Sequence, residues 1–127
     1  MVTRIGINGF GRIGRLVLRA GFCDPDLEFV AINEPAADAE TMALLLEFDT
    51  VQGRWSRACR AEQAGIRVAD QHLDFWQESS PGDIAWQDAG VDLVIECSGR
   101  FRTSESLRPH LESGARQVLV SAPVPDG

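Results

Sequence analysis

A glycine-rich segment near the amino terminus has the residue types and spacing that bind phosphate groups. Gly9, Gly11 and Gly14 fit the pattern G-x-G-x-x-G between an apolar run and an amphipathic stretch. In that setting the first glycine permits a tight turn, the second lets the backbone approach a pyrophosphate, and the third lets a helix pack against a strand. The start of that helix attracts anions through its free N–H groups and its dipole. The segment therefore predicts a site for the pyrophosphate of a dinucleotide.

An acidic residue follows the glycines at the distance expected for ribose recognition. Glu34 stands twenty positions after Gly14, at the end of the next apolar run. A carboxylate there accepts hydrogen bonds from the adenosine ribose and repels a 2′-phosphate, which favours NAD over NADP. Two alternatives stay open, a glycine turn that serves packing only and a solvated loop carboxylate. Arg12 can add charge near the phosphates, but we expect its backbone to matter more than its side chain.

Short apolar runs alternate with amphipathic stretches, and these elements must position the glycines and the acid. Apolar, β-branched runs predict four strands, around Ile5 and Ile7 and over residues 27–32, 91–97 and 118–121. Helical spacing of apolar residues predicts helices over residues 12–21, 39–48 and 104–113. The alternation is typical of a Rossmann-type α/β fold, a doubly wound, mainly parallel sheet with helices on both faces. We expect one domain, residues 1–127.

The remaining segments lack such strong periodicity. Residues 66–69 and 73–76 predict a hairpin, residues 49–64 a surface loop and residues 79–82 a turn. Asp38 is expected to cap the second helix. Pro109 predicts a late start or a kink in the third helix, because a proline inside a helix removes a hydrogen bond.

The ends of the predicted strands indicate where a ligand would bind. In an open parallel sheet, ligands lie beyond the carboxyl ends of the strands, near the point where strand order reverses. The four strands finish in small or polar residues, at Asn8-Gly9, Asn33-Glu34, Ser98-Gly99 and Ser121-Ala122. The hairpin is not expected to belong to this set.

Composition disfavours several other partners and chemistries. The net charge of −7 repels nucleic acid. All twelve basic residues are Arg, so the chain lacks a Walker-A lysine and a Schiff-base lysine. Cys23, Cys59 and Cys97 are widely spaced, which predicts neither a metal site nor a disulfide framework and favours a cytoplasmic setting. No apolar run approaches the roughly 20 residues of a membrane span, so we expect no membrane partner.

Residues 7–15 closely resemble the amino terminus of the glyceraldehyde-3-phosphate dehydrogenase family. Similar segments follow in the family's order over essentially the whole chain, at residues 30–35, 46–53, 90–92, 96–99 and 121–123. Glu34 replaces the family's usual Asp, Ser98 replaces Thr, and Gln52 replaces His. Glu34 together with residues 46–49 also resembles a subgroup associated with arsenic resistance.

The resemblance implies an NAD groove. Together with the glycine turn, the residues expected to bind the cofactor are Asn8, Gly9, Phe10, Gly11, Arg12, Ile13, Gly14, Asn33, Glu34, Ser98, Gly99, Phe101 and Ser121. Phe101 would lie close to the adenine, with ordinary core packing as the alternative. Ser79 stands where the family carries an arginine near the adenine, which puts that contact in doubt. The intact relatives are homotetramers, so a homo-oligomer is expected.

The resemblance further implies an oxidoreductase whose nucleophilic Cys and activating His lie in a second, catalytic domain. This sequence stops before such a segment, and His72, His110 and the three Cys are interpreted as ordinary residues. We predict no catalytic residue and expect this chain alone to be inactive. Without the carboxyl-terminal helix that packs on the cofactor domain in the family, the chain should expose an apolar face and associate.

Three interpretations of the function stay open. The first is the cofactor domain of a glyceraldehyde-3-phosphate type dehydrogenase, either truncated or naturally short. The second is the cofactor domain of an erythrose-4-phosphate dehydrogenase. The third is a non-catalytic module that binds a dinucleotide.

Overall fold

A seven-stranded sheet forms the centre of the computed structural model, which describes residues 2–49, 52–101 and 103–121. The strand order is β5-β6-β7-β2-β1-β8-β9, and β3 and β4 form a separate small ribbon. The strands are β1 (Thr3–Asn8), β2 (Leu27–Asn33), β3 (Phe48–Asp49), β4 (Gly53–Arg54), β5 (Cys59–Glu62), β6 (Gly65–Val68), β7 (Gln71–Trp76), β8 (Leu93–Glu96) and β9 (Gln117–Val120).

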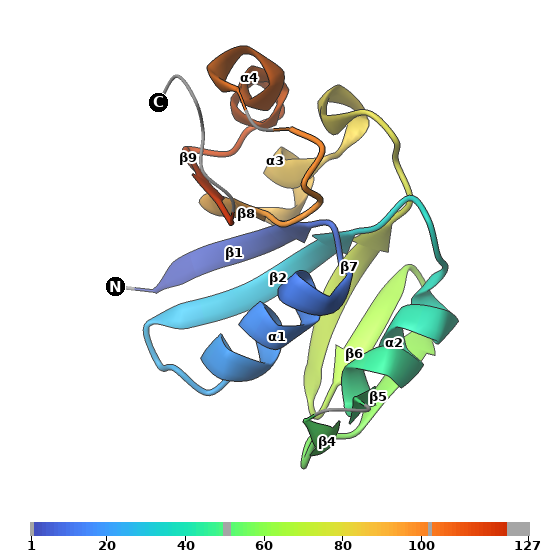
Figure 1. The fold of residues 1–127 in the computed structure, drawn as a ribbon. Coiled ribbons are helices and arrows are strands. Elements are labelled where there is room, and N and C mark those ends of the chain that lie inside the picture. Colours follow the sequence, from blue (N-terminus) through green and yellow to red (C-terminus); the bar gives the residue numbers. More distant parts are fainter. Residues whose placement is uncertain (1, 50–51, 102, 122–127) are drawn as a thin grey trace.

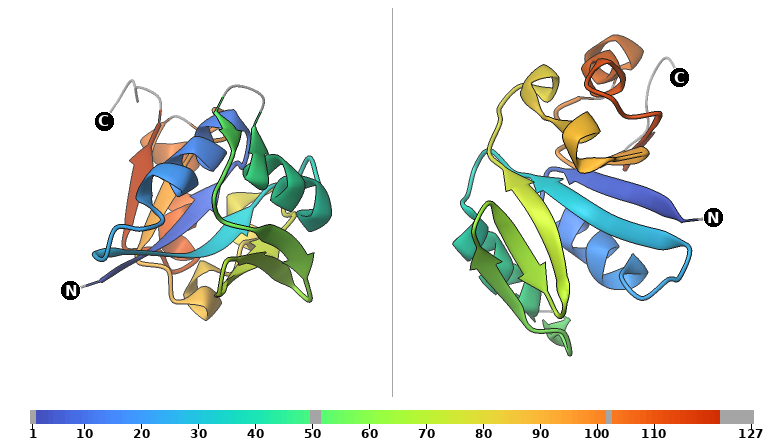
Figure 2. Two further views of the ribbon diagram at one scale, coloured as in Figure 1. Left: turned by 90° about the horizontal axis from the view of Figure 1, so that it is seen from below. Right: turned by 180° about the vertical axis from the view of Figure 1, so that it is seen from behind.

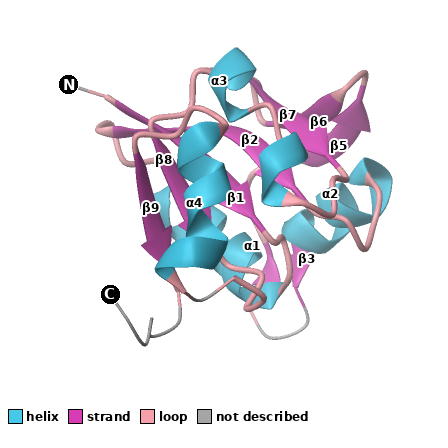
Figure 3. Cartoon of the chain, turned by 90° about the horizontal axis from the view of Figure 1, so that it is seen from above, coloured by secondary structure: helices cyan, strands magenta, loops and turns pink. Residues whose placement is uncertain are grey.

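Five of the sheet strands run parallel to one another. β1 pairs with both β2 and β8, β2 pairs with β7, and β8 pairs with β9. The chain therefore winds outward in one direction from β1 to β2 and in the other direction from β8 to β9, so strand order reverses beside β1. Figure 3 shows the strands in this order. The predicted doubly wound, mainly parallel sheet is confirmed.

Helices cover both faces of the sheet. They are α1 (Arg12–Gly21), α2 (Ala39–Glu47), α3 (Trp86–Ala89) and α4 (Ser104–Glu112), with one 3-10 turn at Pro81–Asp83. α1 and α2 lie on one side, and α3 and α4 lie on the other (Figure 1). Apolar side chains form two cores that match this division. Leu18, Met42 and Leu46 pack under α1 and α2, while Trp86 and Ala115 belong to the cluster on the opposite face.

Local sequence signals account for the ends of several helices. Asp38 caps α2 as predicted, because its carboxylate accepts a hydrogen bond of 2.9 Å from the N–H of Thr41. At the other end of α2, the guanidinium of Arg19 donates to the carbonyl oxygens of Leu46 and Glu47. These carbonyls are left without helical partners, so Arg19 joins the last turn of α2 to α1.

Of the two expectations for the third helix, the late start is wrong, and a kink at Pro109 stays a prediction. α4 begins at Ser104, as the spacing indicated, and continues through Pro109 rather than starting late. Thr103 and Ser106 form a reciprocal capping box at its start, with the N–H of Ser106 bonded to the Thr103 hydroxyl at 3.1 Å. This cap stabilises the first turn. The helix continues although Pro109 has no N–H to donate a helical hydrogen bond.

Residues 49–64 are not simply a surface loop. They include the last residue of β3 and all of β4 and β5, and β5 pairs antiparallel with β6 at the edge of the main sheet. The predicted hairpin is present as β6 and β7, but it is not separate from the parallel strands, because β7 pairs with β2. The right-hand view of Figure 2, seen from behind, shows these green and yellow strands as an extension of the sheet. The carboxyl end of β7 therefore lies at the same edge of the sheet as those of the other parallel strands, contrary to our expectation.

Candidate cofactor site

Two glycines of the turn after β1 are required by close backbone contacts. Gly9 has a φ of 93°, and a Cβ there would lie 2.5 Å from the backbone nitrogen of Ser98. A Cβ on Gly14 would lie 2.3 Å from the carbonyl oxygen of Gly9. Gly11 differs, because a Cβ there would meet no atom within 4 Å. The turn is thus tightly packed on its inner side and open at Gly11, where a phosphate would approach.

The start of α1 is suited to an anion. Its N-cap is Gly11, no described side chain caps it, and its first turn contains no acidic residue. The first N–H groups of the helix point toward this open end, with the positive end of the helix dipole. The guanidinium of Arg12 lies 3.5 Å from the carboxylate of Asp49, whose side chain is buried. This contact gives the guanidinium a partner within the protein, and the expected backbone role of Arg12 stays a prediction.

Glu34 connects the end of β2 to the glycine turn. Its Oε1 accepts a hydrogen bond of 2.7 Å from the N–H of Phe10, and its Oε2 accepts one of 2.9 Å from the N–H of Ala36. Each carboxylate oxygen can accept a second hydrogen bond. Glu34 therefore holds the turn in place and keeps acceptor capacity for a ribose hydroxyl.

A cavity of about 200 Å³ lies where these parts meet. Its lining comes from the ends of β1, β2 and β8: Gly9, Gly11, Glu34, Pro35, Ala36, Cys97, Ser98 and Arg100. β1 stands between the other two strands, at the reversal of strand order. The cavity therefore occupies the position at which open α/β sheets bind their ligands.

Asn8 and Asn33 lie beside this cavity but are directed into the protein. Both are buried, and the side-chain amide of Asn33 donates to Oδ1 of Asn8 at 2.8 Å. Asn33 also exchanges hydrogen bonds of 2.9 Å with the backbone of Glu78, beyond the end of β7. These asparagines join neighbouring strand ends, so their side chains support the site from beneath.

Glu96 is a buried acidic residue beside the cavity to which the sequence analysis assigned no role. It is buried at the end of β8, and Oε1 accepts hydrogen bonds from Nδ2 of Asn8 at 2.7 Å and from Nε2 of His110 at 2.8 Å. Its Oε2 accepts from the N–H of Ser98 at 2.8 Å and from the Ser98 hydroxyl. Burial raises the pKa of Glu96, but the hydrogen bonds from His110, Ser98 and Asn8 outweigh it and hold the pKa below its ordinary value. In the sequence, Glu96 could have been noticed as a charged residue at the end of an otherwise apolar strand.

Ser98 lines the cavity, but its hydroxyl is committed within the protein. The hydroxyl donates to Glu96 and accepts a hydrogen bond of 3.2 Å from the N–H of Arg100. Next to it, Gly99 has a φ of 74° with open space beside its Cα. Ser98 therefore shapes the loop after β8, and Gly99 leaves that loop open toward the cavity.

The other predicted binding residues lie at different depths. The ring of Phe10 is fully buried in the core beneath α1, so the backbone of Phe10 faces the site. Ile13 is 52% exposed at the start of α1. Phe101 is half-buried, with its ring edge-on to His110 at 6.4 Å. Ser121 is exposed, and its N–H donates to the carbonyl of Glu96 at 3.0 Å.

Two of the three thiols are held in their protonated form. Burial, with Glu96 nearby, raises the pKa of Cys97 to about 11 despite its contact with Ser121. Burial and Glu47 raise the pKa of Cys59 to about 12. Cys23 is exposed, with the Arg57 guanidinium 2.8 Å from its sulfur. Since the thiolate is the nucleophile, the half-buried Cys59 and Cys97 are held in their unreactive form.

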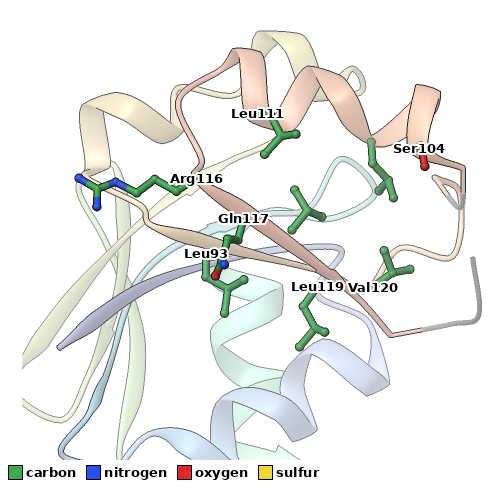
Figure 4. A pocket seen from close by; sticks show the side chains of 9 residues that line it. Leu93, Ser104, Leu111, Arg116, Gln117, Leu119 and Val120 are labelled. Carbon is green, nitrogen blue, oxygen red and sulfur yellow. The ribbon is translucent and has the colours of Figure 1, made fainter. Parts of the chain in front are cut away.

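A second hollow lies away from the glycine turn. It measures about 660 Å³ and lies between the edge strand β9 and helix α4. Figure 4 shows Leu111 of α4 and Leu119 of β9 among its lining residues, and both are exposed, by 47% and 57%. Exposed apolar side chains are therefore present beside this hollow. Among the described residues no helix could span a membrane, and no group of His, Cys, Asp and Glu could hold a metal ion.

Comparison with known protein families decides the relationship. Residues 3–104 match the model of the glyceraldehyde 3-phosphate dehydrogenase NAD binding domain. The chain belongs to the glyceraldehyde-3-phosphate dehydrogenase family. The resemblance seen in the glycine turn and the later segments is thus confirmed, and so are the Rossmann-type fold and NAD as the cofactor of this domain.

Individual relatives agree with the family assignment. The chain is 49% identical over 124 residues to glyceraldehyde-3-phosphate dehydrogenase 3 of Nostoc sp. The aligned residues make up 98% of this chain and 37% of the relative. It is 45% identical over 124 residues to glyceraldehyde-3-phosphate dehydrogenase 1 of Streptomyces arenae, covering 97% and 37%. It is 44% identical over 123 residues to the cytosolic enzyme of Chlamydomonas reinhardtii, covering 97% and 36%. The chain thus spans little more than a third of these relatives.

Proposed function

We propose that this chain binds NAD in the cavity at the carboxyl ends of β1, β2 and β8. The observation that carries the proposal is the juxtaposition of an uncapped helix start at Gly11 with the carboxylate of Glu34 across a cavity of about 200 Å³. The pyrophosphate would rest on the N–H groups of α1, and the adenosine ribose would donate to Glu34. The exposed residues of this edge, among them Ile13, Gly99 and Ser121, would contact the cofactor.

We further propose that the chain supplies the cofactor-binding part of an oxidoreductase that oxidises an aldehyde phosphate, passing hydride to NAD. Support comes from the dehydrogenases to which the chain is similar. The chemical step needs an activated thiolate, whereas burial holds Cys59 and Cys97 as thiols, and Cys23 is not among the residues that line the cavity. The 127 residues alone are therefore expected to bind cofactor as one domain without turning over substrate. Free thiols are compatible with a cytoplasmic location.

Isothermal titration calorimetry of the chain with NAD, NADH and NADP tests this function. We expect saturable binding of NAD and NADH with one site per chain, and weaker binding of NADP because Glu34 repels its 2′-phosphate. A parallel assay with glyceraldehyde 3-phosphate or erythrose 4-phosphate, NAD and phosphate should show no reduction of NAD. Absence of binding by folded chain would refute the cofactor site, and turnover would refute the assignment of the chemistry to residues outside this chain.

We also propose that copies of the chain associate through exposed apolar surface. Leu111 and Leu119 beside the groove between α4 and β9 are the basis of the proposal. Size-exclusion chromatography over a range of concentrations should show a shift toward larger species. A single monomeric peak at high concentration would contradict it.

A further inference from the structure

A row of buried polar side chains runs beneath the proposed cofactor cavity. It starts at Trp86 of α3 and passes through His110 of α4 to Glu96 of β8. From Glu96 it continues to Asn8 of β1 and then to Asn33 of β2. All five residues are 3% exposed or less, so each hydrogen bond forms away from water.

The partners of His110 determine which ring nitrogen carries the proton. The indole Nε1–H of Trp86 lies 3.0 Å from Nδ1 of His110, and an indole nitrogen can only donate. Nδ1 must therefore be the acceptor, which leaves the proton on Nε2. That nitrogen lies 2.8 Å from Oε1 of Glu96 and donates to it. Trp86 thus fixes His110 as a donor toward Glu96.

Glu96 connects His110 to the loop after β8 at the proposed cofactor cavity. One of its oxygens is shared by His110 and Asn8, and the other accepts both the N–H and the hydroxyl of Ser98. Ser98 lines the cavity together with Glu34. The backbone nitrogen of Ser98 also lies where a side chain on Gly9 would stand, so the loop after β8 packs directly on the glycine turn.

We propose that His110 is a positioning residue for the cofactor site. It acts through Glu96, whose carboxylate it orients so that Ser98 and Asn8 hold the loop after β8 against the glycine turn. His110 itself does not touch the cofactor, because it is 0% exposed. The inference rests on the proposed binding of NAD and goes beyond it by giving a role in that binding to a residue of α4.

The proton position can be measured without cofactor. The chain contains two histidines, His72 and His110, so the imidazole nitrogens are few enough to assign by ¹⁵N NMR, with His110→Gln identifying one set. At neutral pH we expect Nε2 of His110 to carry the proton and Nδ1 to be bare. A proton on Nδ1 would overturn the proposal, whether or not NAD binds.

The positioning role is tested with paired variants of the full chain. His110→Leu removes the donor to Glu96, whereas His110→Gln keeps an N–H near the position of Nε2. His72→Gln is the matched control, because His72 is exposed on β7 and contacts Glu62 and Asp74 rather than the buried row. We expect the amide resonances of Ser98 and Gly99 to shift in His110→Leu, to return toward wild type in His110→Gln and to be unchanged in the control.

Cofactor affinity then separates positioning from general stability. The affinity for NAD, referred to the folded fraction, should fall about tenfold in His110→Leu and stay within about twofold of wild type in His110→Gln. A lower melting temperature with unchanged affinity and unchanged Ser98 resonances would show a merely structural role and overturn the proposal. If His110→Leu does not fold, His110→Asn takes its place, because its shorter amide does not reach the position of Nε2: displaced Ser98 resonances that are restored in His110→Gln support the proposal, and unchanged ones overturn it. Failure of wild type to bind NAD would refute the proposed function but leave the proton position and the Ser98 resonances to decide this inference.

Discussion

The backbone N–H of Phe10 donates a hydrogen bond of 2.7 Å to Oε1 of Glu34. This contact joins the turn after β1 to the residue that follows β2, across the point where strand order reverses. The carboxylate expected to bind the ribose therefore also sets the position of the glycine turn. A change at either residue should affect both the pyrophosphate and the ribose parts of the site.

Replacement of Glu34 by Ala should weaken NAD binding and reduce the preference for NAD over NADP. The substitution removes the acceptor for the N–H groups of Phe10 and Ala36 as well as the charge that repels a 2′-phosphate. We expect a loss of about tenfold in NAD affinity, measured by calorimetry. Glu34→Asp is the control, because it keeps the carboxylate and should keep the preference. An unchanged ratio of NAD to NADP affinity in Glu34→Ala would contradict the assignment of Glu34.

Alanine substitutions at two glycines of the turn should have different effects. A Cβ at position 14 would lie 2.3 Å from the carbonyl oxygen of Gly9, so Gly14→Ala should lower the free energy of unfolding by about 1–3 kcal/mol and weaken binding. A Cβ at position 11 meets no atom within 4 Å, so Gly11→Ala should leave stability nearly unchanged but obstruct the pyrophosphate. Urea unfolding and calorimetry measure the two effects. Wild-type NAD affinity in Gly11→Ala would count against the proposed position of the pyrophosphate.

Acid should destabilise the chain in part through Glu96. Its pKa is held below the ordinary value by the hydrogen bonds that it accepts, so the folded chain binds fewer protons than the unfolded chain at moderately acidic pH. The stability from this lowered pKa is fully present above the unfolded-state pKa and is lost as the pH falls through the folded-state pKa. Glu96→Gln should therefore show a smaller decrease of urea midpoint between about pH 7 and about pH 3.

The control for that experiment is an exposed carboxylate that lies outside the buried row. Glu105→Gln on α4 serves this purpose, because Glu105 is exposed in the first turn of the helix. It should reproduce the acid dependence of the wild type closely. Identical pH dependence of wild type and Glu96→Gln would show that the carboxylate of Glu96 does not contribute as argued.

Thiol reagents should modify Cys23 before the other cysteines. Cys23 is exposed, whereas burial raises the pKa of Cys97 to about 11 and that of Cys59 to about 12. Brief treatment with iodoacetamide near neutral pH should add one label, located by peptide mass mapping. Cys23→Ser should abolish this fast reaction. Equally fast labelling of Cys97 in the folded chain would mean that its thiol is more reactive than its surroundings indicate.

The parts of the site that sequence predicted well depend on local chemistry. The glycine spacing and the acid after β2 specify a turn, a helix start and a carboxylate that are close along the chain or joined by one crossover. Asp38 as a helix cap is equally local. These features need no knowledge of how distant segments pair.

The parts that sequence did not predict depend on contacts between distant segments. β7 pairs with β2 in the sheet, and Glu78 reaches Asn33 across 45 residues of chain. Neither fact leaves a periodic signal, because a hairpin strand has the same alternation at the edge of a sheet as inside it. His110 likewise reads as a helix residue, and only the packing of α4 over β8 brings it to Glu96.

Residue-level mapping of NAD on the isolated chain tests the central claim most directly. In two-dimensional ¹H–¹⁵N NMR spectra recorded during a titration with NAD, we predict shifts of the amide resonances at Gly11, Ile13, Glu34 and Gly99, saturating with one cofactor per chain. The amides of Leu111 and Leu119, at the separate groove between α4 and β9, should remain in place. Saturable shifts confined to that groove, or no shifts at all in the folded chain, would contradict a cofactor site at the carboxyl ends of β1, β2 and β8.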